Sequence, residues 1–160
     1  MKTEHLGIGL SVGVLAGIWT QVSIELELIT WVAFIAWACF FAAGGGLTGL
    51  SKGLTGNLSG VAWGWAAGEV ADAMGFDGAL AICVAVIAFF LCVQASIDVL
   101  SFVPAAFAGT AVYFGTAFAF WDCVIALVAG ALLGLASELV GGRIQARIPT
   151  GRRSNHAAVS

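Results

Sequence analysis

The chain has 160 residues, of which 61% are hydrophobic and 9% are charged, and its formal net charge is −3. A water-soluble fold of this length could not remove so much apolar surface from water. The composition therefore excludes a soluble domain and predicts an all-α polytopic membrane helix bundle.

The six basic residues lie near the two ends of the chain and at one internal position, and none falls between Lys52 and Arg143. Basic residues avoid hydrocarbon and collect on the cytoplasmic side of a membrane. An even number of crossings would keep all six on that side, so we expect about six transmembrane helices with both termini cytoplasmic. Residues 1–142 would form a single transmembrane domain, and residues 143–160 a basic, flexible cytoplasmic tail.

Six apolar stretches can be compared with the roughly 20 helical residues that cross a hydrocarbon core. In chain order they are Leu6–Ile24, Ile29–Ala43, Leu54–Ala71, Gly78–Ala95, Val99–Phe118 and Cys123–Gly141. This arrangement gathers most acidic residues on the side opposite the basic ones. They are Glu25, Glu27, Glu69, Asp72, Asp77 and Asp122.

The first stretch carries glycines at a four-residue spacing, Gly9, Gly13 and Gly17, and the last carries Gly130 and Gly134. Residues four apart share one helix face, and their missing side chains let another helix approach closely. We expect these glycines to pack helices within one subunit. The alternative is an interface between copies in a homo-oligomer.

Between the second and third stretches lies the glycine-rich segment 44–60. It lacks the Gly-Lys-Ser/Thr pattern of a phosphate-binding loop. We expect a cytoplasmic turn because Lys52 lies within it. The alternative is a segment that re-enters the membrane and lines a polar path with Thr55, Asn57 and Ser59.

Pro104 lies inside the fifth stretch, where it removes a helical hydrogen bond and predicts a kink. Ser101 could satisfy a freed carbonyl group, and Asp98 could cap the start of the helix. Whether such a kink gates a pathway is left open by the sequence.

Polar residues within spans are the usual sign of a transport pathway. The candidates for a pore or gate are Gln21, Thr55, Asn57, Ser59, Glu69, Gln94, Ser101 and Pro104. Every carboxylate can reach a membrane interface, which disfavours proton-coupled pumping and favours an uncoupled path for a small solute.

The sequence predicts no catalytic residue, cofactor or metal site, and therefore no enzyme. His5 and His156 are close to the chain ends, so no histidine lies within the bundle. The four cysteines are far apart and form no CxxC pair, which favours a role as small apolar side chains. They are Cys39, Cys83, Cys92 and Cys123.

Several segments resemble those of a family of small bacterial inner-membrane proteins. They are Leu15–Trp19, Asn57–Trp63, Leu91–Ala95 and Leu100–Pro104, followed by Phe107 and Gly109. The chain is identified on these segments as similar to the YcdZ-like proteins, domain-of-unknown-function family ten ninety-seven. That resemblance implies an inner-membrane location and several spans, but no substrate. Asn57–Gly60 and Gly75–Gly78 are also similar to urea-channel repeat elements, with one Pro missing and Asp in place of Asn.

The sequence thus predicts a channel or permease for a small neutral or weakly cationic solute. Its expected partners are the lipid bilayer and further copies of the chain, with no nucleic acid. The alternative is a non-transporting membrane accessory protein or partner subunit.

Overall fold

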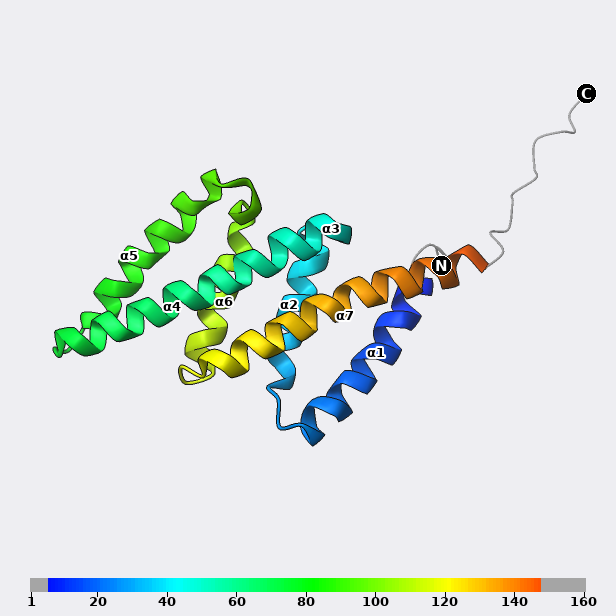
Figure 1. The fold of residues 1–160 in the computed structure, drawn as a ribbon, viewed down its shortest axis with the longest axis horizontal. Coiled ribbons are helices and arrows are strands. Elements are labelled where there is room, and N and C mark those ends of the chain that lie inside the picture. The colour runs from blue at the N-terminus through cyan, green and yellow to red at the C-terminus, as the bar shows by residue number, and fades with distance from the viewer. Residues whose placement is uncertain (1–5, 148–160) are drawn as a thin grey trace, which may run out of the picture.

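The computed structural model describes residues 6–147, which form helices joined by turns and contain no strand (Figure 1). The helices in chain order are α1 Leu6–Glu25, α2 Thr30–Ala42, α3 Gly46–Thr48, the π-helical η2 Gly49–Gly53, α4 Leu54–Met74, α5 Ala79–Val93, the 3₁₀ turns η3 Gln94–Ser96 and η4 Asp98–Leu100, α6 Val103–Gly115 and α7 Phe120–Arg147. The predicted all-α bundle is confirmed.

Three helices of the described chain are both long and apolar enough to cross a membrane: α1, α5 extended by η3, and α7. α2 and α6 are apolar but have 13 residues each, a rise of about 20 Å. A hydrocarbon core is about 30 Å thick, so these two helices are about 10 Å shorter than its thickness.

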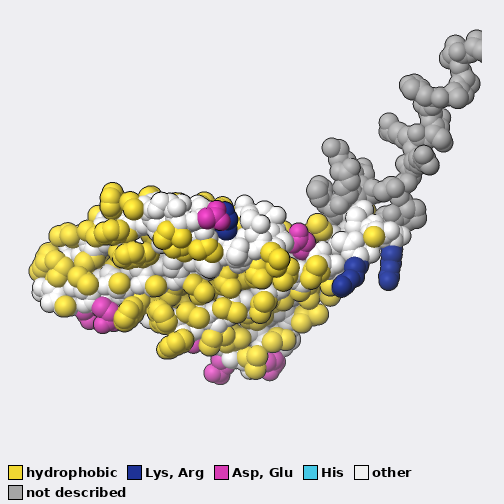
Figure 2. Space-filling view, turned by 45° about the horizontal axis from the view of Figure 1, so that its top comes forward, with side chains coloured by type: hydrophobic (Ala, Val, Ile, Leu, Met, Phe, Trp, Pro, Cys, Tyr) yellow, Lys and Arg dark blue, Asp and Glu magenta, His cyan; other side chains and the backbone are white. Residues whose placement is uncertain are grey.

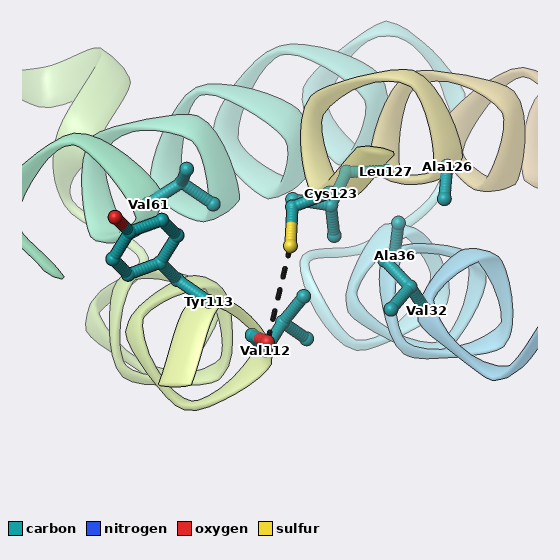
Figure 3. Close-up of a cluster of buried hydrophobic side chains, with 8 residues drawn as sticks. All are labelled: Val32, Ala36, Val61, Val112, Tyr113, Cys123, Ala126 and Leu127. Atoms are coloured by element: carbon teal, nitrogen blue, oxygen red, sulfur yellow. Dashed lines mark hydrogen bonds between the residues drawn. The ribbon is translucent and has the colours of Figure 1, made fainter. Parts of the chain in front are cut away.

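Two long helices form the centre of the bundle. α3, η2 and α4 follow one another without a break, and this helix runs antiparallel to α7 (Figure 1). α6 packs across α4 and α2 packs across α7. α5 covers the outside of α4, and α1 covers the outside of α7. Residues from α2, α4, α6 and α7 meet in an apolar cluster (Figure 3).

Glycines allow the central helices to cross closely. A Cβ atom at Gly60 of α4 would collide with the carbonyl oxygen of Ala106 in α6, and one at Gly130 of α7 would collide with that of Ala33 in α2. The backbones therefore touch at both crossings, as small residues permit in membrane helices.

The surface of the bundle is apolar. Figure 2 shows hydrophobic side chains over most of the visible face, with the charged side chains towards its margins. We call the end of the bundle that carries Lys52 and Arg143 the basic end, and the end that carries Asp77 and Asp122 the acidic end. Such an apolar belt between charged margins is the surface of a protein embedded in lipid.

The glycine-rich segment 44–60 is neither a long turn nor a re-entrant loop. Gly44 and Gly45 have positive φ angles of 108° and 69° and end α2, and a helix begins at once at Gly46. No proline follows to stop it, so the helix continues through the π-helical turn into α4. Thr55, Asn57 and Ser59 consequently lie on a regular helix.

Pro104 does not kink a helix, in contrast to the prediction. α6 begins at Val103, so Pro104 occupies the first turn, where its missing N–H has no helical partner to lose. Asp98 does not cap α6 either, because α6 is preceded by Phe102 and Asp98 belongs to η4.

The glycine pair of α7 packs within the chain, with Gly134 against the ring of Phe40. The glycine ladder of α1 does not. A Cβ atom at Gly9, Gly13 or Gly17 would meet no described atom within 4 Å, because α1 contacts α7 through its other face. For this ladder the expected packing within one subunit is wrong, as far as residues 6–147 show.

Candidate functional site

A cavity of about 470 Å³ opens at the acidic end of the bundle, among the end of α4, the start of α5 and the end of α6. Its lining consists of Gly68, Glu69, Ala71, Asp72, Phe76, Asp77, Gly78, Ala79, Leu80, Tyr113 and Phe118. The cavity is large enough for a small organic solute.

Local sequence brings three carboxylates to the rim of this cavity. Glu69 and Asp72 are three residues apart in α4, so they share one face of the helix. Gly75 then ends α4 in the left-handed conformation, with φ of 63°, and Gly78 precedes α5 with φ of 94°. These two glycines enclose a tight turn that returns Asp77 to the same rim.

Tyr113 of α6 supplies the inner wall of the cavity. Its side chain is buried, with 4% exposed, and its ring packs edge-on against Phe118 at a centroid distance of 5.5 Å. Gly64 of α4 makes room for the ring, because a Cβ atom there would lie 3.0 Å from it. Within residues 6–147 the phenol hydroxyl has no hydrogen-bond partner, although buried tyrosines usually find one.

This arrangement suits a small solute with hydrogen-bonding groups and a positive charge. Among the lining residues all three charged side chains are acidic. A recess lined by one sign of charge raises the local concentration of the opposite charge. The Tyr113 hydroxyl could donate to or accept from a solute that entered between the carboxylates.

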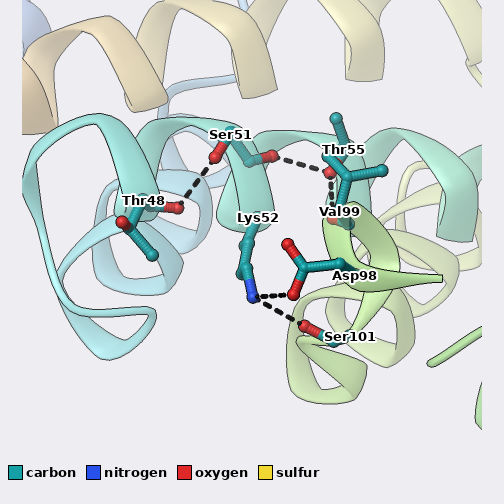
Figure 4. A network of polar contacts seen from close by, with 7 residues as sticks. All are labelled: Thr48, Ser51, Lys52, Thr55, Asp98, Val99 and Ser101. Atoms are coloured by element: carbon teal, nitrogen blue, oxygen red, sulfur yellow. Dashed lines mark hydrogen bonds and ion pairs between the residues drawn. The ribbon is translucent and has the colours of Figure 1, made fainter. Parts of the chain in front are cut away.

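A separate polar cluster lies at the basic end (Figure 4). Lys52 Nζ donates to Asp98 Oδ1 at 2.7 Å and to Ser101 Oγ at 3.1 Å. Thr55 Oγ1 donates to the carbonyl oxygens of Ser51 and, at 2.7 Å, Val99. These contacts join η2 and the start of α4 to the turns before α6. These side chains bind one another and do not line the cavity at the acidic end, which favours a structural role; the Asp98 carboxylate is exposed, so its ion pair with Lys52 contributes little to stability.

Ser59 and Gln94 take part in the contact between α4 and α5. Gln94 Nε2 donates to Ser59 Oγ at 3.1 Å, and Trp63 Nε1 donates to Gln94 Oε1 at 3.1 Å. The Trp63 ring also stacks on Phe90 with centroids 5.2 Å apart. Both predicted pore residues therefore bind partners between two helices.

Two further candidates stand apart from the cavity. Gln21 is exposed on α1, where its Nε2 donates to Glu25 Oε1 at 2.9 Å. Asn57 is fully buried in α4, and neither its side-chain nitrogen nor its oxygen has a hydrogen bond of good geometry in the described structure, although the Cys39 thiol lies beside the amide. An amide left in this way is costly.

The eight predicted pore residues therefore do not form one pathway. Glu69 alone among them lines the acidic cavity. The sequence reasoning missed Tyr113, although it is the single tyrosine of the chain and lies in an apolar span. A phenol in an apolar span needs a polar partner, and this requirement could have identified Tyr113 as a candidate site residue. The described residues also contain no group of three potential metal ligands.

Known proteins resemble this chain over nearly its full length. The family model described as "Protein of unknown function (DUF1097)" matches residues 9–142. An uncharacterized protein of Escherichia coli strain K12, YahC, is 30% identical over an alignment of 148 positions, which covers 85% of this chain and 90% of YahC. Inner membrane protein YcdZ of the same strain is 33% identical over an alignment of 150 positions, which covers 89% of this chain and 88% of YcdZ. A YcdZ of Salmonella typhimurium is 29% identical over an alignment of 161 positions, which covers 96% of this chain and 94% of that protein.

No solved structure matches the chain. The names of the relatives agree with the apolar belt and the membrane-length helices. The chain is thus an integral membrane protein, and it belongs to the DUF1097 family of proteins of unknown function.

Proposed function

We propose that this protein is an inner-membrane permease or channel for a small, weakly cationic solute. It would cross the membrane six times, with the acidic end outside and the basic end and both termini in the cytoplasm. The observation that carries the proposal is the acidic cavity, which is lined by three carboxylates and by Tyr113, whose hydroxyl has no hydrogen-bond partner within residues 6–147. The basic residues at the opposite end support this orientation.

The acidic rim favours a cation over a neutral solute, because carboxylates at the mouth concentrate cations by long-range attraction. The cavity offers oxygen atoms as ligands and a phenol as a hydrogen-bond partner, which is suited to an ammonium group. Methylammonium is therefore the first probe, with urea and glycerol as neutral probes of similar size.

The test is uptake of these three probes into liposomes that contain the purified full chain. We expect methylammonium uptake above that of empty liposomes, and we expect Asp72→Asn to lower it about tenfold by removing one rim charge. Glu25→Gln is the matched control, because it removes a carboxylate that does not line the cavity. Equal uptake of all three probes with and without protein would sink the proposal.

The alternative function is a non-transporting partner subunit. The open glycine face of α1 supports it, because three adjacent turns of helix have room for another backbone. A partner protein that co-purifies in stoichiometric amount, together with no uptake of any probe, would favour this alternative.

A further inference from the structure

We infer that the chain consists of two inverted structural repeats and that the acidic cavity has a counterpart at the basic end, which opens when the cavity closes. Repeat one comprises α1, α2 and the continuous helix α3–α4, and repeat two comprises α5, α6 and α7. Each repeat contains three helical passes, an odd number, so the second begins on the opposite side from the first.

The packing of the helices follows this pairing. α6 of repeat two crosses α4 of repeat one, and α2 of repeat one crosses α7 of repeat two. The peripheral contacts also match, since α5 covers α4 and α1 covers α7. In Figure 1 a half-turn within the page brings α4, α5 and α6 roughly onto α7, α1 and α2. The long helices in the middle belong to different repeats.

The two central crossings agree residue by residue. At one, Gly60 lies against the carbonyl oxygen of Ala106. At the other, Gly130 lies against that of Ala33. Gly60 and Gly130 are 70 positions apart in the sequence, and Ala33 and Ala106 are 73 positions apart. The same residue types make the same backbone contact in each repeat.

One helical turn further on, the correspondence continues with the same offsets. A Cβ atom at Gly64 would lie 3.0 Å from the ring of Tyr113. A Cβ atom at Gly134 would lie 2.7 Å from the ring of Phe40. An aromatic residue of the short helix thus fills the space above a glycine of the long helix in both repeats.

The turns after the two short helices also have the same hydrogen bonds. The N–H of Gly45 donates to Phe40 O at 3.0 Å, and the N–H of Phe118 donates to Tyr113 O at 3.0 Å. In each turn the preceding residue bonds three positions back, and residues 44–45 and 117–118 all have positive φ. α2 and α6 therefore end in the same type of turn, and the turn after α6 forms without glycine.

The two repeats differ where the cavity lies. At the acidic end, Ala71 of α4 and Ala79 of α5 line the open cavity. α5 and α1 correspond with an offset of 72, which pairs the buried Ala79 and Cys83 with the buried Gly7 and Ser11. The counterparts of Ala71 and Ala79 at the basic end are therefore Gly141 of α7 and Gly7 of α1, which are in direct contact. A Cβ atom at Gly7 would lie 2.5 Å from Gly141 O.

Hydrogen bonds hold this contact at the basic end together. The N–H of Gly7 donates to Gln145 Oε1 at 3.0 Å, and Ser11 Oγ donates to Ser137 O at 2.7 Å. Glu138, which is the counterpart of Gly68, accepts from the N–H of Gly46 at 2.6 Å. The equivalent helix junction is thus open at one end and closed at the other, although Leu139 and Gly142 stand at the basic end where the cavity has Glu69 and Asp72.

Inverted repeats let a transporter exchange these two states, because each repeat can adopt the conformation of the other. Closing α5 onto α4 would then accompany opening of α1 from α7, which would uncover Ser11 and Glu138 to the basic side. The repeats are a property of the fold, whereas the exchange rests on the proposed transport function. It would make the protein a carrier with alternating access, in place of an open channel.

The experiment measures access to the basic-end contact in liposomes, using the full chain with its four cysteines replaced by alanine. Ser11→Cys reports the opening of α1 from α7, since Ser11 is buried there. Ala71→Cys with Leu80→Cys allows a short bifunctional reagent to cross-link the walls of the acidic cavity. We expect cross-linking to raise the rate at which a water-soluble maleimide labels residue 11 by roughly tenfold or more.

Ser23→Cys is the matched control, because Ser23 is a fully buried serine on the same helix near its other end. Its labelling should stay unchanged. The inference would be overturned if cross-linking left the labelling of residue 11 unchanged. It would also be overturned if cross-linking raised the labelling of residues 11 and 23 equally.

A second variant keeps the test decisive if the cross-linked chain aggregates. Ala71→Trp places a bulky side chain in the acidic cavity and prevents its closure, so labelling at Ser11→Cys should fall. An unchanged rate would contradict alternating access. Labelling needs no solute flux, so the two proposals can fail separately. Solute uptake without a change in the labelling of residue 11 would refute alternating access and favour a channel. A change in labelling without uptake of any probe would refute the proposed transport function.

Discussion

At the scale of single residues, Asn57 is the least explained side chain of the bundle. It is fully buried without a hydrogen-bond partner, and the inverted repeat matches it with Leu127, a fully buried apolar residue. The fold therefore accepts leucine at the equivalent place. An unpaired amide in such surroundings costs about 1–3 kcal/mol.

We accordingly expect Asn57→Leu to leave the fold intact and to raise the free energy of unfolding by about 1–3 kcal/mol. Thermal unfolding of the purified protein in detergent would show this as a higher midpoint. A lower midpoint would mean that the amide has a partner in the folded protein. Loss of methylammonium uptake together with a higher midpoint would identify Asn57 as a solute-binding group.

The roles of individual polar residues could be predicted only where sequence neighbours decide them. Glu69 and Asp72 share a helix face because of their spacing, and the structure places both at one cavity. Asp98 was expected to cap a helix but pairs with Lys52, which is 46 positions away in the sequence. Such a partner depends on how helices are arranged, and local spacing does not contain that information.

At the scale of elements, the glycines of the central crossings and those of α1 should respond differently to an added methyl group. Gly60→Ala would press against Ala106 O and separate α4 from α6, at a cost of roughly 1–3 kcal/mol. Gly9→Ala meets open space, and alanine also favours the helix. The midpoint of thermal unfolding should fall for Gly60→Ala and stay level or rise for Gly9→Ala.

The open ladder of α1 leads to a prediction about assembly. With no described atom near Gly9, Gly13 or Gly17, this face is available to a second copy of the chain. A leucine side chain at position 13 would displace a second copy packed on this face, so Gly13→Leu should reduce the mass of the protein–detergent complex, as measured by light scattering. Gly142→Leu is a suitable control, since that glycine is also open but lies outside the ladder. An equal mass for both variants and the unmodified chain would contradict the prediction.

The positions of the helices were largely predictable, because hydropathy and glycine mark where the chain leaves the apolar region. The third, fifth and sixth stretches were the exceptions. α7 runs from Phe120 to Arg147, so residues 143–147 of the predicted flexible tail are helical. Leucine, threonine and serine between the glycines of segment 44–60 allow the helix to start at Gly46, eight residues before the predicted span. Pro104 shortens α6 because proline is compatible with a first helical turn, which the sequence does not distinguish from a kink.

At the scale of the whole molecule, alternating helix directions make the proposed orientation testable. Asp77 lies in the turn between α4 and α5, and Ser96 lies in the turns between α5 and α6. In a background without native cysteines, we expect an impermeant maleimide to label Asp77→Cys in intact cells. Ser96→Cys should be labelled after permeabilisation. Labelling of both from the same side would exclude a crossing by α5.

The inverted repeat could not be read from the sequence. The two halves share glycine and alanine at their crossings, and these residues are common in any membrane helix. Elsewhere the equivalent positions differ, as with Gly44–Gly45 and Ala117–Phe118, which adopt the same turn with different residues. Backbone geometry has stayed alike while the side chains changed.

The short helices α2 and α6 have an electrical consequence. Each spans about 20 Å, while the surrounding hydrocarbon is about 30 Å thick. Where water reaches the ends of these helices, the membrane voltage falls over about 20 Å, which is about two-thirds of the hydrocarbon thickness. The electric field there is about one and a half times as strong as in the surrounding bilayer. In the orientation proposed above, this field would move a positively charged solute from the acidic to the basic end. A negative potential inside the cell would then drive uptake through the thinnest part of the barrier.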